Sequence, residues 1–339
     1  MKRITIIICA VLLFVLPVFG QNVTKSGTTA ATFLTIDTGV RGSGMGSAYV
    51  SVSDDINAMY WNPAGVARIR EKQALFTNVQ WIADITFNYA AVAIPAGQIG
   101  TFGMNASFMS TDEMMVTTIQ EPDGTGETFQ VGSYALGLIY AKELTDRFSI
   151  GFNVKYIQEQ IYHSTARGMA IDVGTLFDTQ FQGLKIGMSI SNYGTKMRMS
   201  GRDMLIQSDI DPLKNGNNEN INANLQADTY DLPLLFRVGM SVDVLKGLYN
   251  SHLILSADAL HPNDNTESVN IGAEYAYNNL VAVRCGYKNL FRENSEEGLC
   301  LGGGLNMKVT GNAFLHLDYA WGDFGILKDV QKFAIGLTF

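Results

Sequence analysis

The chain has 339 residues, of which 47% are apolar and only 17% are charged, and its formal net charge is −8 at pH 7. This charge argues against a nucleic-acid-binding function, because phosphates need clustered Lys and Arg side chains. The apolar content excludes a disordered chain, and the absence of a run of about 18 apolar residues after the N-terminus excludes a bundle of membrane-spanning helices. Low charge, 34 glycines and many aromatic residues favour one large barrel over two ordinary domains.

Residues 1–20 have the pattern of a secretory signal peptide. Lys2 and Arg3 precede an apolar stretch that Pro17 interrupts. Val18 and Gly20 are acceptable small residues at positions −3 and −1, so we expect cleavage before Gln21. An uncleaved anchor helix is the alternative. It is disfavoured because the apolar stretch is short.

The next segment, residues 21–70, does not alternate like a strand, and we expect it to fill the barrel as a plug with short helices. Ser53 or Asp54 is placed to cap a short helix that runs to Trp61. Pro63 then begins another short helical turn, because proline is tolerated in the first turn of a helix.

A glycine-rich stretch lies within this plug, between residues 39 and 46. It is not a phosphate-binding loop, because Ser47 stands where the third glycine of a G-x-G-x-x-G motif belongs and no lysine follows. We interpret it as backbone that passes through a crowded space, where glycine permits close approach.

From about Gln73 onward, apolar and polar residues alternate with period two, which is the pattern of a strand with two different faces. Alternation alone fits a soluble sandwich as well as a transmembrane barrel with its apolar face toward lipid. We expect fourteen strands, over residues 72–82, 84–94, 98–110, 127–142, 147–160, 168–179, 182–192, 233–244, 251–260, 267–277, 279–290, 298–308, 311–321 and 331–339.

The connections between these strands favour the membrane barrel, because short turns and longer links alternate almost throughout. Outer-membrane barrels have short periplasmic turns and long external loops, and an even strand number. The connection near Ala83 is an exception, since it is short where a long one is expected. The expected longer links are residues 111–126, 161–167, 193–232, 261–266, 291–297 and 322–330.

The chain ends on a strand with Phe339 as its last residue. An aromatic C-terminal residue resembles the signal that the outer-membrane assembly machinery reads. The fold class that we expect is therefore all-β: a 14-stranded antiparallel transmembrane β-barrel over residues 71–339, placed in the bacterial outer membrane.

Two cysteines, Cys285 and Cys300, lie beyond the signal peptide. Cys285 shares a face with the apolar residues of its strand, whereas Cys300 lies on the opposite face of the next strand. A regular hairpin cannot join side chains on opposite faces, so we predict two free thiols.

The plug carries the most specific motifs of the chain. In order they are F-L-x-I, R-G-S-G-M-G-S-A, D-D and Y-W-N-P-A-G, between residues 33 and 66. This order resembles the PorV/PorQ family of outer-membrane proteins, which are relatives of the FadL transporters of hydrophobic compounds. The motif residues that we expect to form the plug and its seat are Arg41, Gly44, Met45, Gly46, Asp54, Asp55, Asn62, Pro63, Ala64 and Gly65, and Arg41 and the Asp54–Asp55 pair are the expected contacts with the barrel.

The resemblance implies a FadL-like barrel with its N-terminal segment in the lumen. PorV members are components of the type IX secretion system and bind the C-terminal signal domains of exported cargo. We therefore expect a docking or shuttle component for exported proteins, whose partners are outer-membrane lipid, secretion-complex proteins and cargo C-terminal domains. The alternative is a FadL-like channel for uptake of hydrophobic compounds. The external loops 111–126 and 193–232 are the expected docking surfaces.

No motif for chemistry accompanies these features, and we expect no enzyme, no cofactor, no metal and no nucleic-acid partner. The four histidines are scattered without a zinc-binding spacing, and no G-x-S-x-G motif occurs. We expect the charged residues of the lumen to pair with one another or with the plug. They are Lys155, Asp172, Arg237, Asp243, Arg284 and Asp318.

Overall fold

The computed structural model describes residues 25–339 except 212, 215, 217–219, 247, 293–294 and 312. The predicted signal peptide and residues 21–24 of the predicted plug lie outside the described residues. No described helix is long and apolar enough to cross a membrane.

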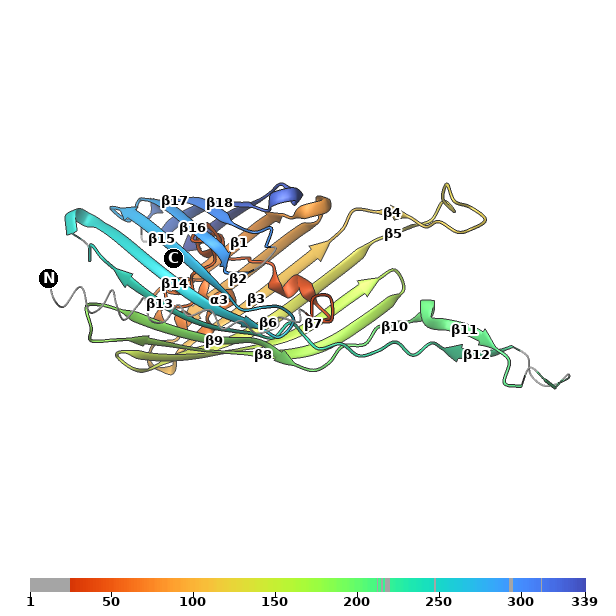
Figure 1. Ribbon diagram of the computed structural model, residues 1–339. Coiled ribbons are helices and arrows are strands. Elements are labelled where there is room, and N and C mark those ends of the chain that lie inside the picture. The colour runs from red at the N-terminus through yellow and green to blue at the C-terminus, as the bar shows by residue number, and fades with distance from the viewer. Residues whose placement is uncertain are drawn as a thin grey trace.

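Fourteen antiparallel strands form a closed barrel, as predicted (Figure 1). The first strand pairs with both the second and the last strand, which closes the sheet. The barrel strands are β1 (Gln73–Gln80), β2 (Thr86–Pro95), β3 (Thr101–Ser110), β6 (Val131–Thr145), β7 (Phe148–Ile161), β8 (Ser164–Asp178), β9 (Lys185–Gly194), β13 (Leu235–Asp243), β14 (Ser251–Pro262), β15 (Ser268–Tyr277), β16 (Val281–Leu290), β17 (Leu299–Thr310), β18 (Ala313–Asp323) and β19 (Asp329–Thr338).

The outer face of the barrel is apolar and the inner face is largely polar. On β7, Phe152 and Val154 are 39% and 47% exposed, whereas the alternating residues Asn153 and Lys155 are buried. A soluble sandwich would place these residues the other way round. This distribution is that of a barrel whose outer face contacts lipid.

The predicted long link at residues 161–167 is wrong. β7 runs to Ile161 and β8 begins at Ser164, so only two residues form this turn. The ends of both strands continue to pair as far as the turn, and Thr165 lies opposite Gln160. Because these polar residues lack apolar partners at alternate positions, the end of the strand resembled a loop in the sequence.

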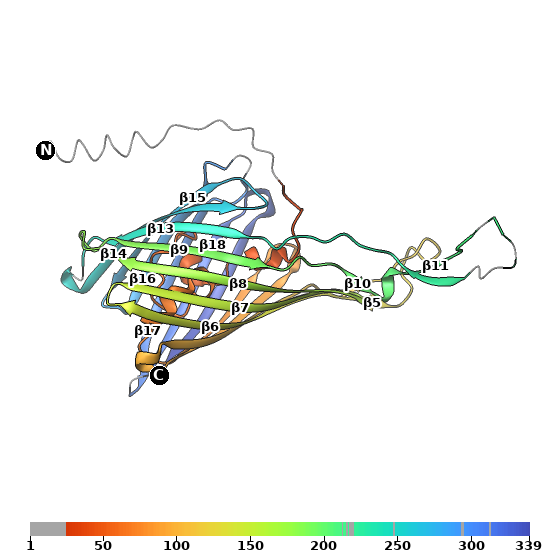
Figure 2. The ribbon, with the colours of Figure 1, turned by 90° about the horizontal axis from the view of Figure 1, so that it is seen from below.

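Two long connections project from one end of the barrel (Figure 2). The first arm, residues 111–130, contains β4 (Met114–Met115) and β5 (Thr128–Phe129). The second arm, residues 195–234, contains β10 (Ser200–Gly201), the 3-10 helix η5 (Arg202–Met204), β11 (Leu205–Ser208) and β12 (Ile221–Asn224). In the remaining turns lie η3 (Ile82–Asp84), η4 (Gly97–Ile99), η6 (Leu248–Asn250) and η7 (Gly325–Leu327).

Both cysteines are free, as predicted. Cys285 on β16 is exposed on the outer face, and Cys300 on β17 is buried on the inner face. Cys300 pairs with Gly286 rather than with Cys285, so the two thiols lie on opposite sides of the barrel wall.

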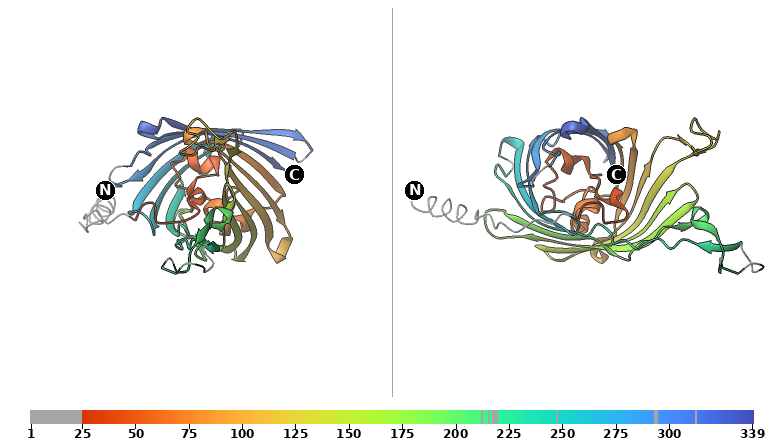
Figure 3. Two further views of the ribbon diagram at one scale, coloured as in Figure 1. Left: turned by 90° about the vertical axis from the view of Figure 1, so that its right-hand side faces the viewer. Right: turned by 45° about the vertical axis from the view of Figure 1, so that its right-hand side comes forward.

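The segment before β1 lies inside the barrel, where the strands surround it (Figure 3). Residues 25–70, here called the plug segment, form η1 (Thr32–Thr35), α2 (Val40–Gly44), α3 (Ala58–Trp61) and η2 (Pro63–Arg68). Apolar plug residues such as Phe33 and Met59 are almost fully buried and belong to one cluster with Phe87 and Tyr89 of the wall. The plug segment therefore supplies part of the barrel core.

The predicted cap of α3 is wrong. The helix begins at Ala58 after Asn57, and neither Ser53 nor Asp54 caps it. The Ser53 hydroxyl instead donates to the Tyr49 carbonyl, and Asp54 accepts a bond from Arg41. Arg41 therefore binds the carboxylate that the local sequence pattern assigned to the helix end.

Candidate functional site

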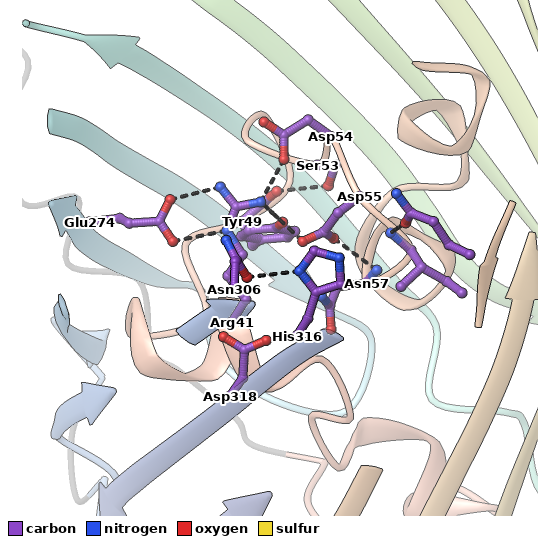
Figure 4. Close-up of polar contacts among 12 residues, drawn as sticks. Arg41, Tyr49, Ser53, Asp54, Asp55, Asn57, Glu274, Asn306, His316 and Asp318 are labelled. Atoms are coloured by element: carbon purple, nitrogen blue, oxygen red, sulfur yellow. Dashed lines mark hydrogen bonds and ion pairs between the residues drawn. The ribbon is translucent and has the colours of Figure 1, made fainter. Parts of the chain in front are cut away.

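Arg41 lies at the centre of the contact between the plug segment and the barrel (Figure 4). Helix α2 carries this side chain, and Nη1 donates to Asp54 at 2.6 Å and to Asp55 at 3.0 Å. On the wall, Glu274 of β15 accepts from Nη2 at 2.7 Å and from Nε at 2.9 Å. This two-point contact has the geometry in which a guanidinium and a carboxylate bind most specifically.

The ion pairs continue from Glu274 into the barrel wall. Arg284 of β16 donates from Nε to Glu274 at 2.6 Å and also pairs with Asp318 of β18. The Glu274 and Arg284 side chains are only 4% and 6% exposed. Because each buried charge has partners of opposite sign, the removal of one member leaves an uncompensated charge.

A second ionic anchor joins the plug segment to the wall at Asp37. Lys288 of β16 donates to its carboxylate at 2.9 Å, and Nζ of Lys332 on β19 lies 3.8 Å away. Ser47 of the plug also donates to Asp37, at 2.6 Å. The sequence did not predict this anchor, although Lys332 lies on the polar face of its strand.

The glycine-rich motif follows the barrel wall at very short range. A Cβ atom at Gly44 would lie 3.1 Å from Cα of Gly302, and one at Gly46 would lie 2.5 Å from the Tyr287 nitrogen. Between the two glycines, the Met45 side chain is fully buried. The predicted close approach of backbone therefore exists, with a wall glycine opposite Gly44.

Replacing Gly46 by Ala should destabilise the barrel well beyond the effect of a strained backbone alone. Gly46 and Gly97 share a φ of +61°, but a Cβ at Gly97 would meet nothing within 4 Å. Gly97→Ala is therefore a control for φ alone, and we expect Gly46→Ala to cost about 1–3 kcal/mol more, as overpacking does. Urea unfolding of both variants measures this difference, and equal losses would contradict the close approach.

The Asn62–Gly65 motif seats the other side of the plug segment against β7 and β8. The Asn62 amide donates to the carbonyls of Val50 at 2.9 Å and Thr175 at 3.0 Å. Its side-chain oxygen accepts from Ala64 nitrogen at 3.1 Å, which caps η2. A Cβ at Gly174 would lie 2.8 Å from Pro63, so a glycine in the wall makes room for this motif as well.

Most of the lumen charges pair as expected. Lys155 and Asp172 form an ion pair at 2.8 Å, and Asp243 lies 2.6 Å from Nδ1 of His252. Arg237 donates to the Ser191 hydroxyl at 3.0 Å and also contacts the plug, where its guanidinium lies 5.5 Å from the centre of the Trp61 ring.

A cavity of about 460 Å³ lies on one side of the plug segment, toward the end of the barrel that has the short turns. We call it the vestibule. Its walls come from the strand ends next to those turns, and the plug segment around Asp54 and Asp55 forms its inner boundary. Both nitrogens of His316 are bonded there, to Asn306 at 2.7 Å and to Thr338 at 2.8 Å. The ionisable residues that line the vestibule are Arg41, Asp54, Asp55, Lys185, Asp243, His252, Glu274, Arg284, His316 and Asp318.

The two arms at the opposite end are joined at the two-residue β7–β8 turn. Tyr162 donates to Glu127 of the first arm at 2.8 Å, and the His163 ring contacts Asp203 of the second arm at 3.1 Å. The slight burial of Asp203 acts to raise the pKa of its carboxyl, but hydrogen bonds from Ser164 and His163 outweigh it and lower the pKa. The two arms are thus held as a pair.

The last residue, Phe339, is 52% exposed, and its nitrogen donates to the Lys72 carbonyl at 2.9 Å. Its role as an assembly signal stays a prediction.

Among the described residues, no group of three or more His, Cys, Asp or Glu side chains is arranged to hold a metal ion.

The comparisons with known proteins agree with this architecture. The family model described as "Type IX secretion system protein PorV" matches residues 20–207. No curated protein sequence matches the chain.

Three solved structures with a similar fold share little sequence identity with this chain. CymD, a monoaromatic hydrocarbon channel, has a TM-score of 0.57 at 10% identity and covers 89% of this chain and 97% of its own. A Pseudomonas aeruginosa FadL homologue has a TM-score of 0.52 at 13% identity and covers 93% and 99%. The toluene transporter TbuX of Ralstonia pickettii has a TM-score of 0.50 at 12% identity and covers 88% and 96%. At these identities the likeness establishes the fold alone, a barrel like that of the FadL homologue. The PorV family match together with this fold places the chain in the outer membrane.

Proposed function

Because the chain belongs to the PorV family of type IX secretion system proteins, we propose that it docks exported proteins at the outer membrane and passes them between components of a secretion complex. In this proposal, residues 21–70 are a plug, residues 71–339 are the barrel, and the arms are the docking surface. The partners are secretion-complex proteins and the C-terminal domains of exported cargo, and the chain performs no catalysis.

The observation that carries this proposal is the pair of arms. They project beyond the barrel and contribute nothing to its closure. They expose large apolar side chains away from the apolar outer face of the barrel, including Ile119 at 96%, Ile210 at 74% and Leu213 at 95%. Exposed apolar side chains outside the lipid-facing surface are typical of a surface that binds another protein.

A FadL-like channel for hydrophobic compounds is the second candidate, and the shared fold with the hydrocarbon channel CymD supports it. The vestibule argues against it. This cavity is lined by ten ionisable side chains, whereas a site for a hydrophobic compound is lined mainly by apolar and aromatic ones.

Photocrosslinking from the arms tests the docking role. A photoreactive amino acid at Ile119 or Leu213 should crosslink to exported proteins in living cells. The matched control is Ile99, which is 63% exposed but lies in a short turn at the opposite end. Crosslinks to exported proteins from Ile99 alone, or from none of the three positions, would contradict arm docking.

A further inference from the structure

The vestibule has the size and the position of a binding site that opens toward the periplasm. Its volume of about 460 Å³ falls within the range of known ligand pockets, roughly 300–1,000 Å³. The short turns mark the periplasmic end of an outer-membrane barrel. At its rim the His252 side chain is 38% exposed, so solvent reaches the cavity from that end.

The charge of the vestibule is predominantly negative. Five carboxylates line it, against three cationic side chains. Two of the cations, Arg41 and Arg284, are already bonded to carboxylates of the same network. The plug residues Asp54 and Asp55 remain 35% and 25% exposed at the cavity surface. An excess of carboxylate in a recessed site attracts cationic groups.

A second, independent feature also calls for a hydrogen-bond donor. Asn57 lines the vestibule and is only 4% exposed, and its side-chain oxygen has no hydrogen-bond partner among the described residues. A buried acceptor without a partner is costly, so a molecule that brings a donor to this position is favoured.

We propose that the vestibule binds the Lys or Arg side chains of a peptide segment from a periplasmic partner. Ammonium and guanidinium groups carry positive charge and several N–H donors, which suits both the carboxylates and the Asn57 oxygen. The described residues of the vestibule offer no metal-holding cluster, and the cavity is far larger than one ion needs. The plug segment closes the inner side, so the peptide enters from the periplasm. This site is independent of the arms.

Peptide binding to the purified mature protein in lipid nanodiscs tests the proposal. The probe is a fluorescent peptide of alternating Lys and Arg, and the comparison peptides carry Gln or Glu at the same positions. The basic peptide should bind with an affinity that falls as salt rises, and the Gln and Glu peptides should bind at least about tenfold more weakly, as expected for charge complementarity.

Two kinds of variant locate the site. Asp54→Asn with Asp55→Asn should weaken binding of the basic peptide about tenfold. Because this change also disturbs Arg41, Ala276→Trp provides a second variant, which adds bulk to the vestibule and removes no charged side chain. Asp146→Asn, in an exposed short turn outside the vestibule, is the control and should bind like the unaltered protein. Equal binding of the basic and Gln peptides, or unchanged affinity in Ala276→Trp, would overturn the proposal.

Discussion

Deleting residues 27–65 should open the lumen of the barrel, so that the protein conducts ions. These residues occupy the lumen, and in the described structure the space left between them and the wall near Tyr60 is only about 30 Å³. Without the plug segment, the polar inner face of a 14-stranded barrel would line an open passage. Planar-bilayer recording of the purified variant should therefore show stable open-channel currents that the intact protein lacks.

Two controls make this experiment specific. Deleting residues 115–127 of the first arm should leave the conductance low, because the arm does not enter the lumen. Heat-modified migration in gels should show that each variant still folds as a barrel. If the plug deletion is folded and its conductance is unchanged, the plug segment is not what closes the lumen.

Arg41→Met should lower the free energy of unfolding by about 3–5 kcal/mol, the cost of breaking a buried ion pair by removal of one partner. The variant leaves Glu274 with one cationic partner instead of two and leaves Asp54 and Asp55 without theirs. Urea unfolding in lipid vesicles measures the loss. Arg70→Ala is the matched control, because Arg70 is 73% exposed in its pair with Glu143 and should cost less than about 1 kcal/mol.

A double variant separates charge from packing at this site. In Arg41→Met with Glu274→Gln, a neutral amide replaces the buried carboxylate. The double variant should therefore lose less free energy of unfolding than the sum of the two single variants. Strict additivity would mean that Arg41 stabilises the barrel by packing and not by its contact with Glu274.

Most of the fold was predictable because period-two alternation reports the two faces of a strand directly. The strand number and the outward apolar face follow from it. The β7–β8 turn was missed because Ser164 to Ala166 are small or polar on both faces, so nothing in the local pattern distinguishes this strand end from a loop.

The plug contacts were predictable only in part. We predicted that Arg41 and the Asp54–Asp55 pair contact the barrel. Arg41 does so at Glu274, whereas Asp54 and Asp55 accept from Arg41 within the plug segment. Glu274, the wall partner of Arg41, lies more than 200 residues away in the chain, and its approach depends on the register of the closed barrel. The Asp37 anchor was missed for the same reason, since no local pattern links Asp37 to Lys288.

The arms and the vestibule lie at opposite ends of the barrel, with the plug segment between them. Docking at the arms therefore needs no open lumen. Transport of a hydrophobic compound would need a route around or through the plug segment, past Arg41 and its carboxylates. The two candidate functions thus differ in what they require of the lumen.

Mass spectrometry of the material that co-purifies with the protein from native outer membranes tests the docking role most directly. Both proteins and small molecules should be identified, from the intact barrel and from a variant lacking residues 115–127. We predict that the intact barrel co-purifies with secreted proteins that have a common C-terminal domain. The variant should retain much less of these proteins. A bound fatty or aromatic molecule, with no such secreted proteins, would contradict the docking role and identify a channel instead.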